Sequence, residues 1–123
     1  MPITVDHAAI LRERLSDGLH SARKERDLIS VANFRTLMAA LDNANAVDVD
    51  LSGPSMSVTG SADVPRRTLS HGDVTEILWS ELDECTSSAI EYQRHGREKE
   101  AAELEAQAAF IKNILEKWEQ ETL

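Results

Sequence analysis

The chain has 123 residues, a formal net charge of −9 and a single cysteine. This length is enough for one domain with its own hydrophobic core, and one cysteine excludes an internal disulfide. The first residues do not follow the pattern of a secretory signal, and no apolar run approaches the roughly 20 residues that span a bilayer. We therefore expect a cytoplasmic protein without membrane contact.

The first part of the chain, residues 4–44, is predicted to form two helices joined by a very short turn. Thr4 or Asp6 suits the N-cap of the first helix, and Asp27 suits the N-cap of the second. Gly18 weakens the first helix by about 1 kcal/mol relative to alanine unless a neighbour packs closely against it. The helical period predicts the inward-facing residues of the second helix, namely Leu28, Val31, Phe34, Met38 and Leu41.

Residues 45–69 change in character. Glycine, proline, serine and aspartate dominate this segment, which has no aromatic residue. A connection of this length inside a compact domain is usually a functional lid or disordered, and the composition favours disorder. We expect a long flexible loop between the second and third helices.

The last part of the chain, residues 70–121, is predicted to form a long antiparallel helical hairpin. Ser70 and Asp73 have the spacing of a capping box at the start of the third helix, and Gly96 suits the left-handed residue that ends it. Two apolar seams at spacings of three and four face each other across the hairpin. Their members are Val74, Leu78, Leu82, Cys85, Ala89 and Tyr92, and then Ala101, Leu104, Ala108, Ile111, Leu115 and Trp118. The fold class is therefore all-α, with four main helices in one domain spanning residues 1–123.

The net charge is unevenly distributed. Residues 1–44 carry six basic and six acidic side chains, whereas residues 70–123 carry five basic and thirteen acidic ones. Nucleic-acid affinity depends on neutralising phosphates with lysine and arginine. The charge distribution therefore disfavours nucleic-acid binding by the C-terminal hairpin.

Four basic residues are the candidates for an interaction surface. Arg23, Lys24 and Arg26 form a small basic cluster at the first turn, which could meet an acidic partner or RNA, although a solvated turn explains it as well. Arg35 falls on or beside the predicted buried stripe of the second helix. A guanidinium in that position needs a carboxylate partner, so we expect a structural ion pair with the hairpin.

No residues in the sequence have the spacing of a catalytic or metal site. The four histidines are interpreted as surface or capping residues, because none has a ligand-like partner in sequence. These are His7, His20, His71 and His95. Cys85 lies on an apolar seam, which predicts a buried and unreactive thiol. We expect no cofactor, no metal and no intrinsic catalytic activity.

Three stretches together resemble the N-terminal helical domain of the GatB/YqeY-like family, which is related to the tail of the aminoacyl-tRNA amidotransferase B subunit. The first is Leu15–Asp27 (LSDGLHSARKERD), and the second is Ala32–Ala44 (ANFRTLMAALDNA), whose Arg35 matches an arginine of the family pattern. The third runs from Leu69 to Leu115 and resembles the long hairpin of the family with its Gly-Arg turn.

The resemblance implies a helical interaction module that is accessory to tRNA-dependent amidation or translation, with a component of that machinery as its protein partner. It also implies a second hypothesis, in which the chain contributes as a subunit to carbon–nitrogen ligation with glutamine as amide donor. Weak tRNA binding through Arg23, Lys24 and Arg26 is a third. Longer relatives continue into a second helical domain associated with tRNA, and we expect that domain to be absent here.

The oligomeric state stays open at the level of sequence. Four large side chains give the C-terminal hairpin more apolar surface than a single stripe requires, so a homodimer is an alternative to a self-contained monomer. They are Trp79, Phe110, Ile114 and Trp118.

Overall fold

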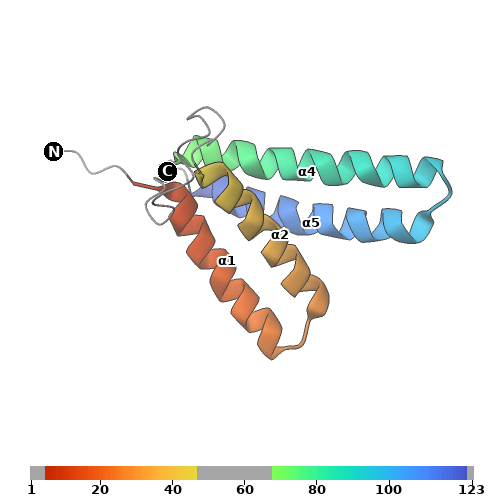
Figure 1. The fold of residues 1–123 in the computed structure, drawn as a ribbon, viewed down its shortest axis with the longest axis horizontal. Helices are drawn as coiled ribbons and strands as arrows, with labels where there is room; N and C mark the ends of the chain where they lie inside the picture. The colour runs from red at the N-terminus through yellow and green to blue at the C-terminus, as the bar shows by residue number, and fades with distance from the viewer. Residues whose placement is uncertain (1–4, 47–67, 122–123) are drawn as a thin grey trace, which may run out of the picture.

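The computed structural model describes residues 5–46 and 68–121 of the chain. Within these residues the fold consists of four helices, shown in Figure 1. They are α1 (His7–Lys24), α2 (Leu28–Asn45), α4 (His71–Arg94) and α5 (Glu98–Gln120). The predicted all-α fold with a C-terminal helical hairpin is confirmed. Most of the predicted flexible loop, at residues 47–67, lies outside the described residues.

Side-chain caps begin three of the helices at the predicted positions. The Asp6 carboxylate accepts a hydrogen bond from the backbone N–H of Ala8 at the start of α1. The Asp27 carboxylate accepts from the backbone N–H of Ser30 at the start of α2. Ser70 and Asp73 form the expected capping box, in which each side chain accepts from the backbone N–H of the other.

The turns that close the two hairpins have the same hydrogen-bond pattern. At the end of α4, the N–H of Gly96 donates to Gln93 O, and the N–H of Arg97 donates to Tyr92 O. Residues 22–27 repeat this pattern at the end of α1. This is the Schellman arrangement, which requires one residue in the left-handed conformation. Gly96 fills that position with φ +72°, whereas in the first turn Arg26 fills it with φ +58°.

One hydrophobic core draws on all four helices. The predicted seams of α4 and α5 pack against each other, and most of their members are buried. Residues of α1 and α2 cover one end of this hairpin and join the same core. The buried members are Ala8, Leu11, Leu15, Leu37, Leu41, Leu69, Val74, Leu78, Cys85, Ile111, Leu115 and Trp118.

The predicted inward face of α2 is wrong at its beginning. Leu28 is 77% exposed, although the helical period had placed it in the core. Leu37, which the prediction omitted, is 1% exposed. The reason is tertiary: the first turn of α2 lies beyond the part of the helix that contacts the long hairpin, so no neighbour covers Leu28.

Gly18 packs closely against α2, next to a contact between the two hairpins. A Cβ atom at this position would lie 2.4 Å from the Phe34 ring of α2, so only glycine leaves room for that ring. Phe34 in turn meets Phe110 of α5 edge to face, with ring centroids 4.9 Å apart. Phe34 is therefore the close neighbour that the glycine accommodates, and it contacts both α1 and α5.

All four helices have one end in a common base, and the two hairpins diverge from it (Figure 1). Asp6 ties this base together, because its carboxylate also accepts from the backbone N–H of Leu69 at 3.1 Å and from Asn45 Nδ2 at 3.5 Å. Arg14 of α1 forms a salt bridge with Glu121 beyond the end of α5. We call α1–α2 the short arm and α4–α5 the long arm.

Candidate functional site

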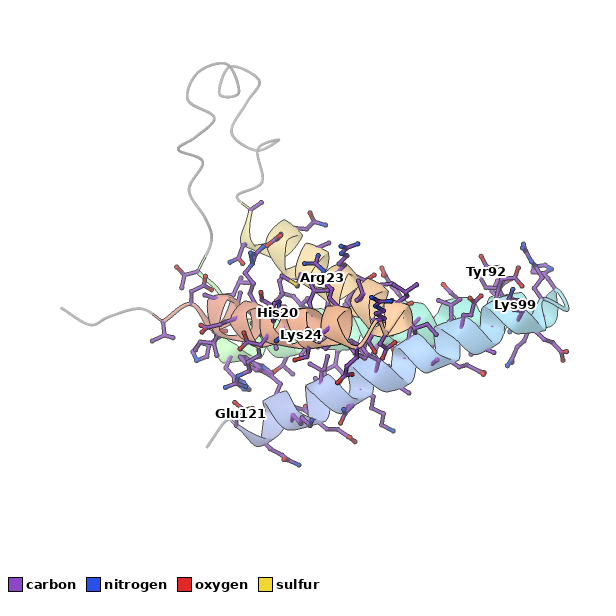
Figure 2. The ribbon with its side chains drawn as sticks, turned by 90° about the horizontal axis from the view of Figure 1, so that it is seen from below. His20, Arg23, Lys24, Tyr92, Lys99 and Glu121 are labelled. Carbon is purple, nitrogen blue, oxygen red and sulfur yellow. The ribbon has the colours of Figure 1, made fainter. Side chains whose placement is uncertain are left out.

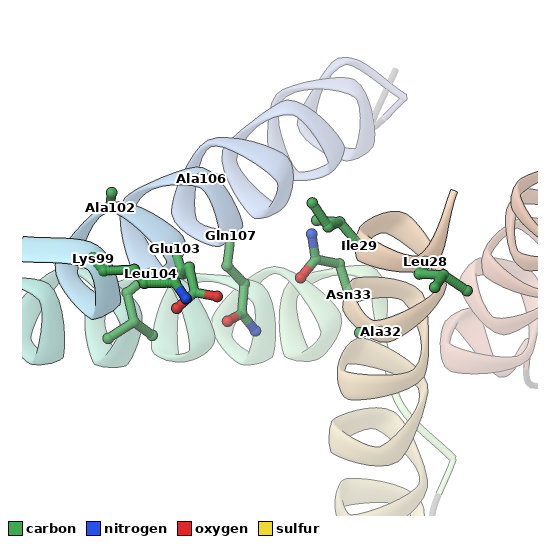
Figure 3. A pocket seen from close by; sticks show the side chains of 10 residues that line it. All are labelled: Leu28, Ile29, Ala32, Asn33, Lys99, Ala102, Glu103, Leu104, Ala106 and Gln107. Carbon is green, nitrogen blue, oxygen red and sulfur yellow. The ribbon is translucent and has the colours of Figure 1, made fainter. Parts of the chain in front are cut away.

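An apolar cleft lies where the two arms diverge. It has a volume of about 570 Å³ and lies between the first turns of α2 and the first half of α5. Figure 3 shows Ile29 and Asn33 extending from α2 toward α5. The lining residues are Leu28, Ile29, Ala32 and Asn33 from α2 with Lys99, Ala102, Glu103, Leu104, Ala106 and Gln107 from α5.

The short-arm wall of the cleft carries two large apolar side chains that the fold leaves uncovered. Leu28 is 77% exposed and Ile29 is 72% exposed. Single exposed apolar residues are normal on protein surfaces, but adjacent ones at the lip of an apolar cleft are typical of an interaction site. The opposite wall on α5 is mixed: Ala102, Leu104 and Ala106 are apolar, whereas Lys99, Glu103 and Gln107 are polar or charged.

Three of the predicted site residues lie together at the tip of the short arm. Arg23 and Lys24 belong to the last turn of α1 and are labelled in Figure 2. Arg26 lies in the turn itself, and all three side chains are exposed. Within residues 5–46 and 68–121 none of them forms a salt bridge. The sequence therefore placed these three residues on one surface, directly before the lip of the cleft.

Arg35 does not occupy the predicted position. The residue is exposed on α2 rather than buried, and in the described part of the chain it forms no ion pair with the long arm. The expectation of a buried guanidinium is wrong because the buried stripe of α2 runs through Leu37 and Leu41. Arg35 is therefore separate from the cluster at the turn.

The two arms differ in charge. Residues 23–35 of the short arm contain four basic and two acidic side chains. Residues 81–107, which form the outer half of the long arm, contain eight acidic and three basic side chains. A few of these are paired locally, such as Arg97 with Glu100 at 2.7 Å. The tip of the short arm is thus net basic and the outer half of the long arm net acidic, although the residues that line the cleft itself include only two charged ones, Lys99 and Glu103.

Neither the cleft nor its lip was predicted from the sequence. The signal that could have found the lip is the adjacent pair Leu28–Ile29, because neighbouring residues on a helix point about 100° apart and do not share one narrow buried stripe. The cleft itself has no sequence signal, since it depends on the angle between two hairpins.

Cys85 is buried, as predicted. Burial raises the pKa of its thiol, and the nearby carboxylates of Glu81 and Glu84 raise it further. Burial also raises the pKa of Glu81, with a further contribution from Glu84. Because the thiolate is the nucleophilic form, this environment suppresses the reactivity of Cys85.

Two of the four histidines are half-buried at the base of the fold, where the helices meet. His7 and His71 are the first residues of α1 and α4, and their rings lie 5.8 Å apart near Trp118. His20 and His95 are exposed. Among the described residues, no group of three or more histidine, cysteine, aspartate or glutamate side chains is arranged to hold a metal ion.

No helix in the described part of the chain has the length and apolar character needed to cross a membrane. Comparisons of the chain with protein-family models, with curated proteins and with solved structures found no match.

Proposed function

We propose that this protein is a non-catalytic interaction module that binds a protein partner through the tip of its short arm. The surface consists of Arg23, Lys24 and Arg26, followed by the exposed pair Leu28–Ile29. Basic and apolar groups side by side are typical of protein interfaces, in which arginine is enriched.

The observation that carries this proposal is the conformation of Arg26. Its φ of +58° is one that costs a non-glycine residue roughly 1–2 kcal/mol, and glycine fills the equivalent position of the second turn. Backbone strain of this kind tends to occur at functional sites. A strained and exposed arginine that follows two other basic residues, Arg23 and Lys24, is therefore best explained by what its side chain binds.

The resemblance to GatB/YqeY-like proteins indicates which partners to test first. We expect the module to bind a component of tRNA-dependent amidation or translation, such as an amidotransferase subunit or an aminoacyl-tRNA synthetase of the same cell. The acidic long arm favours a protein partner over a phosphate backbone.

The test is a binding titration of the purified chain against each candidate partner, in which calorimetry or fluorescence anisotropy detects binding. A variant with Arg23→Glu, Lys24→Glu and Arg26→Glu should lose binding. The matched control is Arg94→Glu, which reverses an exposed arginine at the tip of the long arm. Equal binding by both variants, or no binding by the native chain to any component, would contradict the proposal.

Weak tRNA binding is the second candidate, and it is favoured by the same three exposed side chains, which form no salt bridge within the described residues. Phosphate contacts must weaken steeply as the salt concentration rises. A salt titration with tRNA therefore separates it from protein binding. The hypothesis of a ligase subunit has a separate test. It is the rate at which an amidotransferase hydrolyses glutamine, measured with and without this chain.

A further inference from the structure

We propose that the outer face of α4 is a second docking surface, which binds a basic amphipathic helix of a partner protein. This surface consists of Trp79, Asp83, Thr86 and Ile90, all of them exposed, and we call it the outer seam. It lies on the long arm, whereas the basic tip lies on the short arm, so its partner is independent of the one that the tip binds.

The spacing of the outer seam is that of a helix-packing surface. Its members follow one another at intervals of four, three and four residues. Helices pack along each other through residues at this spacing. The other side of α4 is already used, because Val74, Leu78, Cys85 and Ala89 are buried in the long arm. The outer seam is therefore a second packing face of the same helix, left uncovered by the fold.

Two large apolar side chains are the anchors of the outer seam. Trp79 is 49% exposed and Ile90 is 46% exposed. They are eleven residues apart, close to three full turns, so they point in nearly the same direction about 16.5 Å from each other. Between them, Thr86 Oγ1 donates to Leu82 O at 2.9 Å, so this hydroxyl is satisfied within the helix. Tryptophan is among the residues that most often dominate the binding energy of an interface.

The charges of α4 indicate the chemistry of the partner. Residues 71–93 contain six aspartate or glutamate residues and no lysine or arginine. Within residues 5–46 and 68–121, no lysine or arginine forms a salt bridge with Glu76, Asp83 or Glu84. A partner helix that covers the anchors would meet these carboxylates at its edges, where charged residues determine which helices pair. Lysine or arginine at those positions complements them.

Trp79 itself is placed to receive a cation. Glu76 lies three residues before it and Asp83 four residues after it, so both carboxylates are its neighbours on the helix surface. An indole ring attracts a lysine or arginine side chain over its face. In the described part of the chain no such side chain lies over the Trp79 ring. A cationic residue of the partner would contact the ring and a carboxylate together.

The same charges disfavour other occupants of the outer seam. A second copy of α4 carries the same carboxylates, and like charges across an interface are unfavourable. A phosphate backbone and an anionic lipid surface are repelled for the same reason. A basic amphipathic helix is the occupant that matches both the apolar anchors and the acidic surroundings.

The test uses two synthetic helical peptides of about three heptads with leucine at positions a and d. One peptide carries lysine at positions e and g, and the other carries glutamate there. Fluorescence anisotropy of the labelled peptides, titrated with the full chain up to about 100 μM, measures binding. The lysine peptide should bind at least about tenfold more tightly than the glutamate peptide, and added salt should weaken its binding. Equal binding of the two peptides, or no binding of the lysine peptide, would overturn the proposal.

Matched variants locate the surface. Ile90→Ala and Asp83→Lys should each weaken binding of the lysine peptide by about tenfold. The controls make the same changes in side-chain size and charge at exposed residues outside the outer seam, namely Ile10→Ala and Glu116→Lys, and should bind like the native chain. Circular dichroism checks that each variant remains helical.

Two outcomes of these measurements would contradict the proposal. One is an equal loss of binding in a variant and its control, because the peptide would then not be held at the outer seam. The other is a dimer of the chain alone that Ile90→Ala dissociates, detected by sedimentation as twice the mass of 13.6 kDa. A second copy would then be the occupant of this surface.

Discussion

His71 and Trp118 form two hydrogen bonds with each other's backbone, although 47 residues separate them. His71 Nε2 lies 2.9 Å from Trp118 O, and Trp118 Nε1 donates to His71 O at 3.2 Å. Because a carbonyl oxygen can only accept, Nε2 of His71 carries the proton in this contact. The rings are also stacked, with centroids 4.5 Å apart and planes at 5°. The pair joins the first residue of α4 to the last turn of α5.

Substitution of Trp118 should separate the packing of this pair from its hydrogen bonding. Trp118→Phe keeps an aromatic ring but loses the indole N–H, so we expect a loss of about 1 kcal/mol in the free energy of unfolding. Trp118→Ala empties a core site and should cost about 3–5 kcal/mol. Urea denaturation measures both. His95→Ala, at an exposed histidine, is the control and should change stability little.

Gly18→Ala should destabilise the fold although alanine is the better helix former. The added Cβ would lie 2.4 Å from the Phe34 ring, and displacing that ring should cost about 1–3 kcal/mol. Gly72→Ala is the matched control, because a Cβ atom added at Gly72 would lie 3.8 Å from Ser70 Oγ, an ordinary van der Waals distance. Thermal unfolding should show a lower midpoint for the first variant and an unchanged or higher one for the second. The same shift in both would contradict the packing argument.

Arg26→Gly should stabilise the protein and weaken partner binding at the same time. Glycine removes the cost of the left-handed conformation, about 1 kcal/mol, but it also removes the guanidinium. Gly96→Ala at the equivalent position of the long arm should destabilise it by a similar amount. Chemical denaturation and binding titrations on the same samples test this trade-off. A destabilised Arg26→Gly variant would refute it.

The cap of α2 should make stability depend on pH in acid. Hydrogen bonds from the Ser30 side chain and then from its backbone N–H lower the pKa of Asp27 below its ordinary value. A carboxylate whose pKa is lower in the folded protein than in the unfolded chain stabilises the folded state at pH values above its unfolded pKa. This stabilisation disappears as the pH falls through the pKa of the folded state. Asp27→Asn retains a good N-cap without a titrating group. The difference in urea midpoint between the two proteins should be constant above about pH 5 and change below about pH 4.

The sequence predicts this fold well where the interactions are local. The caps at Asp27 and Ser70, and the left-handed Gly96, follow from residue types within one turn of chain. The seams of the long arm also follow, because two long antiparallel helices bury the same stripe along most of their length. Gly18 was expected to weaken α1 unless a neighbour packs closely against it, and the sequence does not identify Phe34 as that neighbour.

The positions that the sequence did not predict depend on the angle between the arms. Leu28 has the period of a core residue but lies beyond the point at which α2 leaves the long arm. Arg35 is exposed because the buried stripe of α2 runs through Leu37 and Leu41. The cleft depends on the angle between the arms, and the contacts near their junction include the fit of Phe34 between Gly18 and Phe110, three residues on three helices. Such long-range geometry leaves no pattern along the chain. The basic cluster was found because it is contiguous in sequence.

All four helices have one end at the base around Asp6, so a small change of angle there produces a larger displacement at the tip of each arm. The 18 residues of α1 extend for about 27 Å, so a rotation of about 10° at the base moves the tip by about 5 Å. Substitutions at Asp6 or Gly18, both of which lie away from the tips, should therefore change the distance between the tips of the two arms.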